Sequence, residues 1–123
     1  MGIRFNRGEK MMEEKTTQWL YDYQQHLKVF SEKKAYRVYL EEYSKTIKSQ
    51  QMKVAEKAGF KTAASQEREA RLSEVYINHI ELVRTVYEEE LKAQFKMKAI
   101  EMEIELFRTQ QASQRLDRKA HNF

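Results

Sequence analysis

Residues that interrupt helices are almost missing from this chain. It has 123 residues with no proline, and of its three glycines only Gly59 lies within the body of the sequence. On either side of Gly59 the chain is rich in Lys, Glu, Gln, Ala, Met and Leu, which lose little conformational freedom on entering a helix. The sequence therefore predicts an all-α fold, a long antiparallel helical hairpin that is coiled-coil-like and oligomerising.

The expected organisation has five parts. Residues 1–10 are predicted as a flexible N-terminal arm, 11–58 as the first helical arm, 59–64 as the turn, 65–119 as the second helical arm and 120–123 as a tail. The turn is placed at Gly59 because glycine adopts the left-handed conformation after a helix end at little cost.

The first arm carries two apolar stripes. One helical face holds Leu20, Tyr23, Leu27 and Phe30. The next set is displaced from it by about two residues and contains Tyr36, Leu40, Tyr43, Ile47 and Val54. Because Ser31 lies at the mismatch and can cap a new helix, we expect a helix over about 16–30, a kink near 31 and a longer helix over about 32–58.

Two serines could begin the second arm. Ser65 is a plausible cap, with Glu67 and Glu69 in the first turn that would follow. Ser73 is a second candidate. We favour one helix from 65 and keep a break at 73 as the alternative.

The second arm has the stronger pattern. A heptad-spaced stripe, broken only by Glu90, contains Leu72, Tyr76, His79, Val83, Val86, Ala93, Met97, Ile100, Ile104 and Phe107. A second stripe runs beside it and contains Ile77, Ile80, Tyr87, Leu91, Phe95, Met102 and Leu106. One partner helix needs one seam, so the sequence favours self-association, with the interface at Ile80, Leu91, Ile100, Ile104 and Phe107. Alternatively, the kinked first arm folds over the second stripe.

Composition narrows the class of protein. Charged residues make up 34% of the chain and the formal net charge is +4, which mildly favours an anionic partner. There is no cysteine, which excludes a disulfide framework and fits a reducing cytoplasm. No run approaches the ~20 apolar residues of a membrane span, and the first residues lack the apolar core of a signal peptide. We therefore expect a cytoplasmic protein with no membrane partner.

Residues suited to catalysis or metal binding are scattered. The three histidines, His26, His79 and His121, lack the four-residue spacing that places two ligands on one helix face. His79 falls on the apolar stripe and is expected to be buried or interfacial. Glu101 and Glu105 have no Glu-x-x-His motif beside them and are expected on a solvated face. The sequence predicts no enzyme, no cofactor and no metal site.

Aromatic and basic residues are interleaved in the first arm, as in proteins that bind single-stranded nucleic acid. Tyr23, Tyr36 and Tyr43 fit core positions, whereas Tyr21 and Tyr39 fall off the stripes and are better candidates for an exposed contact. The candidate nucleic-acid-binding residues are Lys33, Lys34, Arg37, Lys53, Lys57 and Lys61. Lys53, Lys57 and Lys61 are four residues apart and align on one face as long as the helix persists.

A resemblance adds to this interpretation. The run Lys53-Val54-Ala55-Glu56-Lys57-Ala58 resembles the lysine-alanine segment of phage recombination mediator proteins of the UvsY type, and the stretch from Arg68 to Arg115 is similar to the C-terminal half of small phage proteins often grouped with them. Gly59 stands where that family has a second basic residue. The resemblance implies a small helical ring-forming protein of the host cytoplasm that binds single-stranded DNA, with a recombinase and a single-strand binding protein as further partners.

Two functions from different classes remain. One is a single-stranded DNA-binding accessory protein, similar to a recombination mediator, that acts as a homo-oligomer. The other is a purely structural coiled-coil adaptor whose basic residues only solvate the helix faces. The interleaved aromatics favour the first and the low net charge favours the second.

Overall fold

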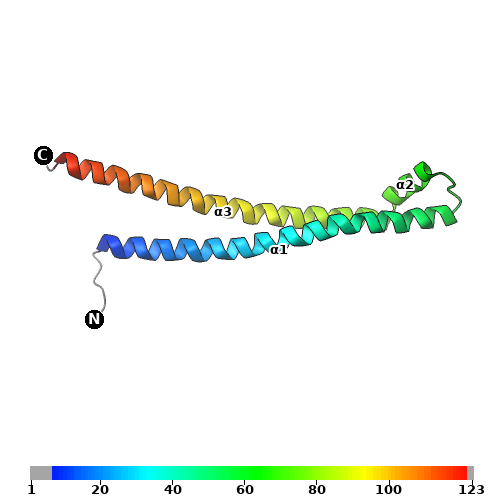
Figure 1. Cartoon of the computed structure of the whole chain (residues 1–123), viewed down its shortest axis with the longest axis horizontal. Helices are drawn as coiled ribbons and strands as arrows, with labels where there is room; N and C mark the ends of the chain where they lie inside the picture. Colours follow the sequence, from blue (N-terminus) through cyan, green and yellow to red (C-terminus); the bar gives the residue numbers. More distant parts are fainter. Residues whose placement is uncertain (1–6, 122–123) are drawn as a thin grey trace, which may run out of the picture. The chain divides into compact units, whose positions relative to one another are not determined.

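The computed structural model describes residues 7–121, and these residues form three helices (Figure 1). They are α1 (Arg7–Lys57), α2 (Ala63–Leu72) and α3 (Glu74–His121). No strand occurs in the described part of the chain. The predicted all-α class is confirmed.

The helices contribute to two compact units. The first contains α1 up to Lys28 and α3 from Ala93 onward, and the second contains Val29–Lys92. In the first unit Trp19 contacts Phe107, and Tyr23, which is later on α1, contacts Glu101, which is earlier on α3. The second unit behaves in the same way. There Lys33 pairs with Glu89, and the Leu40 carbonyl meets His79. Within each unit α1 and α3 are therefore antiparallel.

Helix α1 is continuous through Ser31, contrary to the expected helix end there. Its buried and half-buried face recurs every three or four residues without a phase change, through Trp19, Tyr23, His26, Phe30, Lys33, Arg37, Leu40, Ser44, Ile47, Gln51 and Ala55. At Lys33 and Arg37 this face is charged. A stripe traced through apolar residues alone therefore stops at Phe30 and resumes out of register.

The ends of the helices also differ from the expected boundaries. Helix α1 begins at Arg7, so the last four residues of the expected arm are helical, and residues 1–6 lie outside the described part. At the other end of the chain α3 continues to His121, beyond the expected end at 119. The remainder of the expected tail, residues 122–123, also lies outside the described part.

Helix α1 ends in the predicted place, by a Schellman motif. The Phe60 N–H donates to the Ala55 carbonyl and the Gly59 N–H donates to the Glu56 carbonyl, both at 3.1 Å. Gly59 has a φ of 107°, a conformation that residues with a Cβ rarely adopt. The motif therefore stops the helix and satisfies carbonyls that a helix end leaves open.

Two caps divide the second arm. Thr62, rather than Ser65, caps α2: its side chain accepts from the Ser65 N–H, and the Ser65 hydroxyl accepts from the Thr62 N–H. Ser73 then interrupts the helix, so the favoured single helix from 65 is wrong and the alternative break is present. The Ser73 backbone is extended, and its hydroxyl accepts from the Tyr76 N–H. This capping arrangement begins α3 without glycine or proline.

The core is thin. The buried apolar residues in the described part of the chain are Leu40, Ile47, Ala55, Ala70, Val86, Ala93 and Ile100, and three of these are alanines. Many large apolar side chains remain exposed on the helices. None of the described helices has the length and apolar character that crossing a bilayer requires.

Candidate functional site

Glu90 occupies a position in the buried face of α3. This face contains Tyr76, His79, Val83, Val86, Glu90, Ala93, Met97, Ile100, Ile104 and Phe107, all buried or half-buried. It matches the predicted heptad stripe except at Leu72, which is 65% exposed. Glu90 breaks the apolar pattern but not the spacing, and it is only 4% exposed. A buried carboxylate requires compensation from a partner.

That partner is Arg37. Its Nη2 donates to Glu90 Oε1 at 3.1 Å, and its Nε donates to Glu90 Oε2. Its Nη1 donates to Glu41 at 2.9 Å, and its guanidinium lies 5.0 Å from the centre of the Tyr87 ring. The hydrogen bonds to Glu90 and then to Glu41 raise the pKa of Arg37 further above its ordinary value. Arg37 thus binds α3 with a bidentate, charge-assisted contact.

Lys33 extends this arrangement by one helical turn. Its ammonium forms an ion pair with Glu89, and the hydrogen bond to Glu89 raises the pKa of Lys33. Lys33 and Arg37 had been expected to face a nucleic acid. In the structure both are engaged with carboxylates of α3, because they lie on the inward face of α1.

Three further titratable residues named in the sequence analysis, His79, Glu101 and Glu105, have structural partners. His79 is 8% exposed, as its place on the stripe predicted, and its Nε2 lies 2.7 Å from the Leu40 carbonyl oxygen. Glu101 accepts from the Tyr23 hydroxyl at 3.1 Å, and this hydrogen bond raises the pKa of Tyr23. Glu105 instead pairs with Arg108. Glu101 and Glu105 therefore have separate partners.

A second group of cations lies around the turn. Lys53 and Lys57 are exposed and four residues apart near the end of α1. Lys61 is exposed too, but it follows the helix end and so is not in their row. Within residues 7–121 none of these three lysines has an ion pair or a side-chain hydrogen bond. Lys34 is also exposed, with its ammonium 5.7 Å from the centre of the Phe30 ring.

The region around the turn has an excess of positive charge. Residues 45–71 contain seven Lys and Arg against three Glu. Three of the cations pair with carboxylates: Lys45 with Glu42, and both Lys48 and Arg71 with Glu67. The four that do not are Lys53, Lys57, Lys61 and Arg68. Sequence reasoning missed Arg68. It lies on α2, after the turn, and becomes a candidate phosphate contact only once the position of the turn is known. We call these four residues the basic turn.

The predicted self-association residues divide between two environments. Ile100 is 8% exposed and belongs to the interior of the first unit. Leu91, Ile104 and Phe107 are half-buried, and Phe107 meets Trp19 edge-on at 5.4 Å. Ile80 is 42% exposed. Ile100 therefore lies on the inward face of α3, and the self-association interface stays a prediction.

The second stripe of α3 stays open to solvent. Its exposed members are Ile77, Ile80, Tyr87, Phe95, Met102 and Leu106, with Met102 72% and Phe95 63% exposed. We call this set the apolar stripe. The alternative in which α1 covers it is not realised.

The tyrosines follow the sequence interpretation only in part. Tyr21 and Tyr39 are 58% and 60% exposed, in line with their predicted positions off the stripes. Tyr36 and Tyr43, expected in the core, are 44% and 41% exposed. Tyr23 is half-buried. The difference arises because Lys33, Arg37, Leu40 and Ser44 form the inward face of this part of α1. Tyr36 and Tyr43 lie beside that face and stay exposed.

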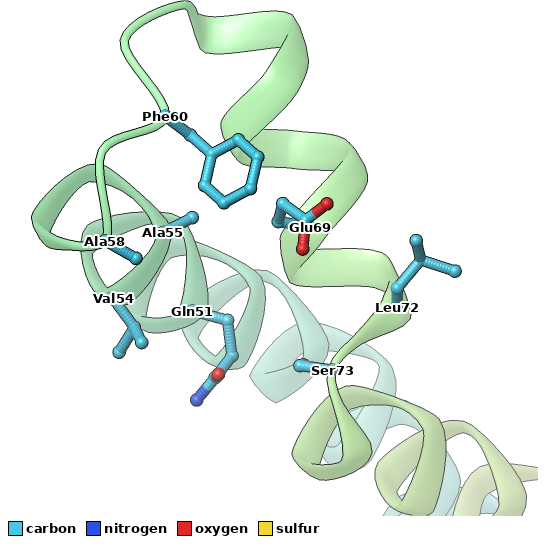
Figure 2. A pocket seen from close by; sticks show the side chains of 8 residues that line it. All are labelled: Gln51, Val54, Ala55, Ala58, Phe60, Glu69, Leu72 and Ser73. Atoms are coloured by element: carbon cyan, nitrogen blue, oxygen red, sulfur yellow. The ribbon is translucent and has the colours of Figure 1, made fainter.

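A small open pocket lies beside the basic turn (Figure 2). Its volume is about 240 Å³, and it is lined by Gln51, Val54, Ala55, Ala58, Phe60, Glu69, Leu72 and Ser73. The Phe60 ring extends from the loop after α1 toward the part of α2 that carries Glu69 (Figure 2). Neither residue was among the binding residues predicted from the sequence.

Comparisons with known proteins give no relative. No family model, no curated protein and no solved structure matches the chain.

Proposed function

We propose that this protein is a homo-oligomeric accessory protein that binds single-stranded DNA, in the manner of a recombination mediator. The observation that carries the proposal is the pair Lys53 and Lys57, exposed and without carboxylate partners in the described part, one turn apart on α1. Exposed lysines in such a row bind backbone phosphates and release counterions. A recombinase and a single-strand binding protein are the protein partners that this proposal expects.

Self-association supplies the affinity that one such row lacks. The buried core is small, and the apolar stripe leaves six large side chains of α3 in solvent. Contiguous exposed apolar surface on a helix favours contact with another helix. Repeating the basic turn in each copy would multiply the phosphate contacts without any new residue.

The proposal includes the complete antiparallel hairpin. Each unit by itself pairs a stretch of α1 with a stretch of α3 in opposite directions. A hairpin through both units keeps the basic turn at one end of every subunit. Assembly would then gather these ends on one surface.

The test is a salt titration of binding to a single-stranded oligonucleotide. Replacing Lys53 and Lys57 with Ala should weaken binding and lower the slope of log affinity against log salt by about 1.4, since each contact to a single strand contributes about 0.7. The matched control replaces Lys92 and Lys96, which are also exposed and four residues apart. If both double variants behave like the unmodified protein, the basic turn is not the binding site.

A structural adaptor is the second candidate, and one observation favours it. Lys33 and Arg37, two of the six expected DNA contacts, are committed to Glu89 and Glu90. Self-association without nucleic-acid binding at low salt would establish the adaptor function instead.

A further inference from the structure

The pocket beside the basic turn combines an aromatic ring with a carboxylate. Phe60 is 36% exposed even though its backbone belongs to the Schellman motif. Glu69 is half-buried, and in the described chain its carboxylate has no hydrogen bond or ion pair. Most of the remaining lining is apolar, from Val54, Ala55, Ala58 and Leu72. The pocket thus offers a flat apolar face and an acceptor for N–H groups.

The charge around the pocket restricts its occupant. Phe60 lies between Lys57 and Lys61 in the sequence, and Lys53 is one turn before Lys57 on α1. A cationic side chain from a partner would suit Glu69 but would meet this group of lysines. A nucleobase carries no net charge, and its attached phosphate is attracted to the same lysines. The charges therefore favour a base of a nucleic-acid strand over a basic peptide.

We propose that this pocket receives one base of the bound single strand, which stacks on Phe60 and donates an N–H to Glu69. The inference rests on the proposed function, because it presupposes that the basic turn holds the strand. Aromatic stacking is tolerant of sequence, since every base has a π-face. Gln51 also lines the pocket and provides an amide that can both donate and accept.

Glu69 gives the pocket a preference among bases. A carboxylate accepts from the exocyclic amino group of cytosine, as Glu and Asp do when they read bases in duplex DNA. Thymine has no amino group, and its single ring N–H lies between two carbonyl oxygens that repel a carboxylate. We therefore expect modestly tighter binding of oligo(dC) than of oligo(dT) of equal length.

The experiment measures the affinities of the full chain for fluorescent oligo(dC) and oligo(dT). Phe60→Leu keeps an apolar contact for the Schellman motif but removes the aromatic ring. It should weaken binding to both strands by between about fivefold and a hundredfold, the range for the loss of one base stack. Phe60→Tyr keeps the ring and should bind like the unmodified protein. Unchanged affinity of Phe60→Leu, in a protein that binds both strands, overturns the stacking role and leaves the proposed function standing.

The base preference has its own pair of variants. Glu69→Ala and Glu56→Ala each remove one negative charge near the turn, but only Glu69 lines the pocket. Both should strengthen binding to oligo(dT) electrostatically, whereas Glu69→Ala also removes the proposed hydrogen bond to cytosine. Only Glu69→Ala should bring the oligo(dC) to oligo(dT) affinity ratio close to one. If that ratio responds equally in both variants or in neither, Glu69 does not contact the base. Failure of the unmodified protein to bind either strand at low salt overturns the proposed function itself.

Discussion

Arg37 of α1 and Glu90 of α3 form a bidentate ion pair within the second unit. Arg37 Nη2 lies 3.1 Å from Glu90 Oε1, and the side chain of Glu90 is 5% exposed. The pair occupies seam positions that are otherwise mostly apolar in the neighbouring turns, namely Leu40 on α1 and Val86 and Ala93 on α3. Because any shift of one helix would separate the two charges, we infer that the pair fixes the register of this unit.

Removing the cation should be costly. Arg37→Met leaves Glu90 buried without a partner, and the free energy of unfolding should fall by about 3–5 kcal/mol. Urea unfolding followed by circular dichroism measures this loss. In the matched control, Arg84→Ala removes an arginine from a pair that is 71% and 57% exposed, and the change should stay within about 0.5 kcal/mol. Similar small losses in both variants would show that Glu90 does not depend on Arg37.

Replacing both Arg37 and Glu90 separates the effect of the ion pair on stability from its effect on the helix register. Arg37→Met combined with Glu90→Leu removes the buried charges together, so most of the loss in the single variant should be recovered. The recovered protein should nevertheless tolerate more than one helix register. Distances between spin labels on α1 and α3 would detect this as a broadened distribution. A single narrow distribution would contradict the role of the pair in fixing the register.

Substitutions at Gly59 should change the stability of the protein through backbone strain alone. Gly59 has a φ of 107°, and a Cβ placed there would meet no atom within 4 Å. Gly59→Ala should therefore destabilise the protein by about 1 kcal/mol or more through strain, without a steric clash. Gly59→Asn should lose less, because Asn tolerates left-handed conformations better. Equal stability of all three proteins in thermal unfolding would exclude a strained turn.

The ion pair between Glu67 and Lys48 should make the free energy of unfolding depend on pH in the acid range. The hydrogen bond from Lys48, helped by its charge and by Arg71, holds the pKa of Glu67 below its ordinary value of 4.5. Since the folded-state pKa is the lower one, this stabilisation is present above 4.5 and is lost as the pH falls through the folded value. The difference in unfolding free energy between the unmodified protein and Lys48→Met should thus shrink at acid pH. A difference that stays constant with pH would argue against this ion pair.

Helix-level features could be predicted from the sequence, whereas the pairing of charges could not. Gly59 marked the end of α1, and the heptads of α3 marked its inward face, including the interruption at Glu90. The partner of Glu90 was not predictable, because spacing within one helix does not give the register between two. The same limitation produced the expected kink at Ser31. Lys33 and Arg37 were expected to contact nucleic acid, because the sequence does not show that Glu89 and Glu90 lie opposite them.

Only the lysines of the candidate site could be predicted from the sequence. Lys53 and Lys57 follow from helical spacing, and their exposure agrees with it. Phe60 and Glu69 are nine residues apart and on different elements. They line the same pocket because the Schellman motif and the Thr62 cap fold α2 back beside the end of α1. That geometry depends on two caps acting together, which residue patterns alone do not specify.

A substitution in the apolar stripe tests the proposed assembly directly. Phe95 is 63% exposed, so Phe95→Asp should leave the helix content and the stability of an isolated chain almost unchanged. If the stripe is buried against a second copy, the same change places an unpaired charge in the contact and should disrupt it. Size-exclusion chromatography with light scattering measures the outcome. The matched control is Tyr21→Asp, which alters an aromatic residue with a similar exposure of 58% outside the stripe and should leave the assembly intact.

Sedimentation equilibrium of the unmodified protein tests whether the chain self-associates. We expect a molar mass that is a multiple of the 14.9 kDa chain and that persists at micromolar concentration, because the apolar stripe requires a second copy to cover it. A well-folded species of 14.9 kDa at every concentration would contradict it, and with it the assembled basic surface on which the proposed binding of single-stranded DNA depends.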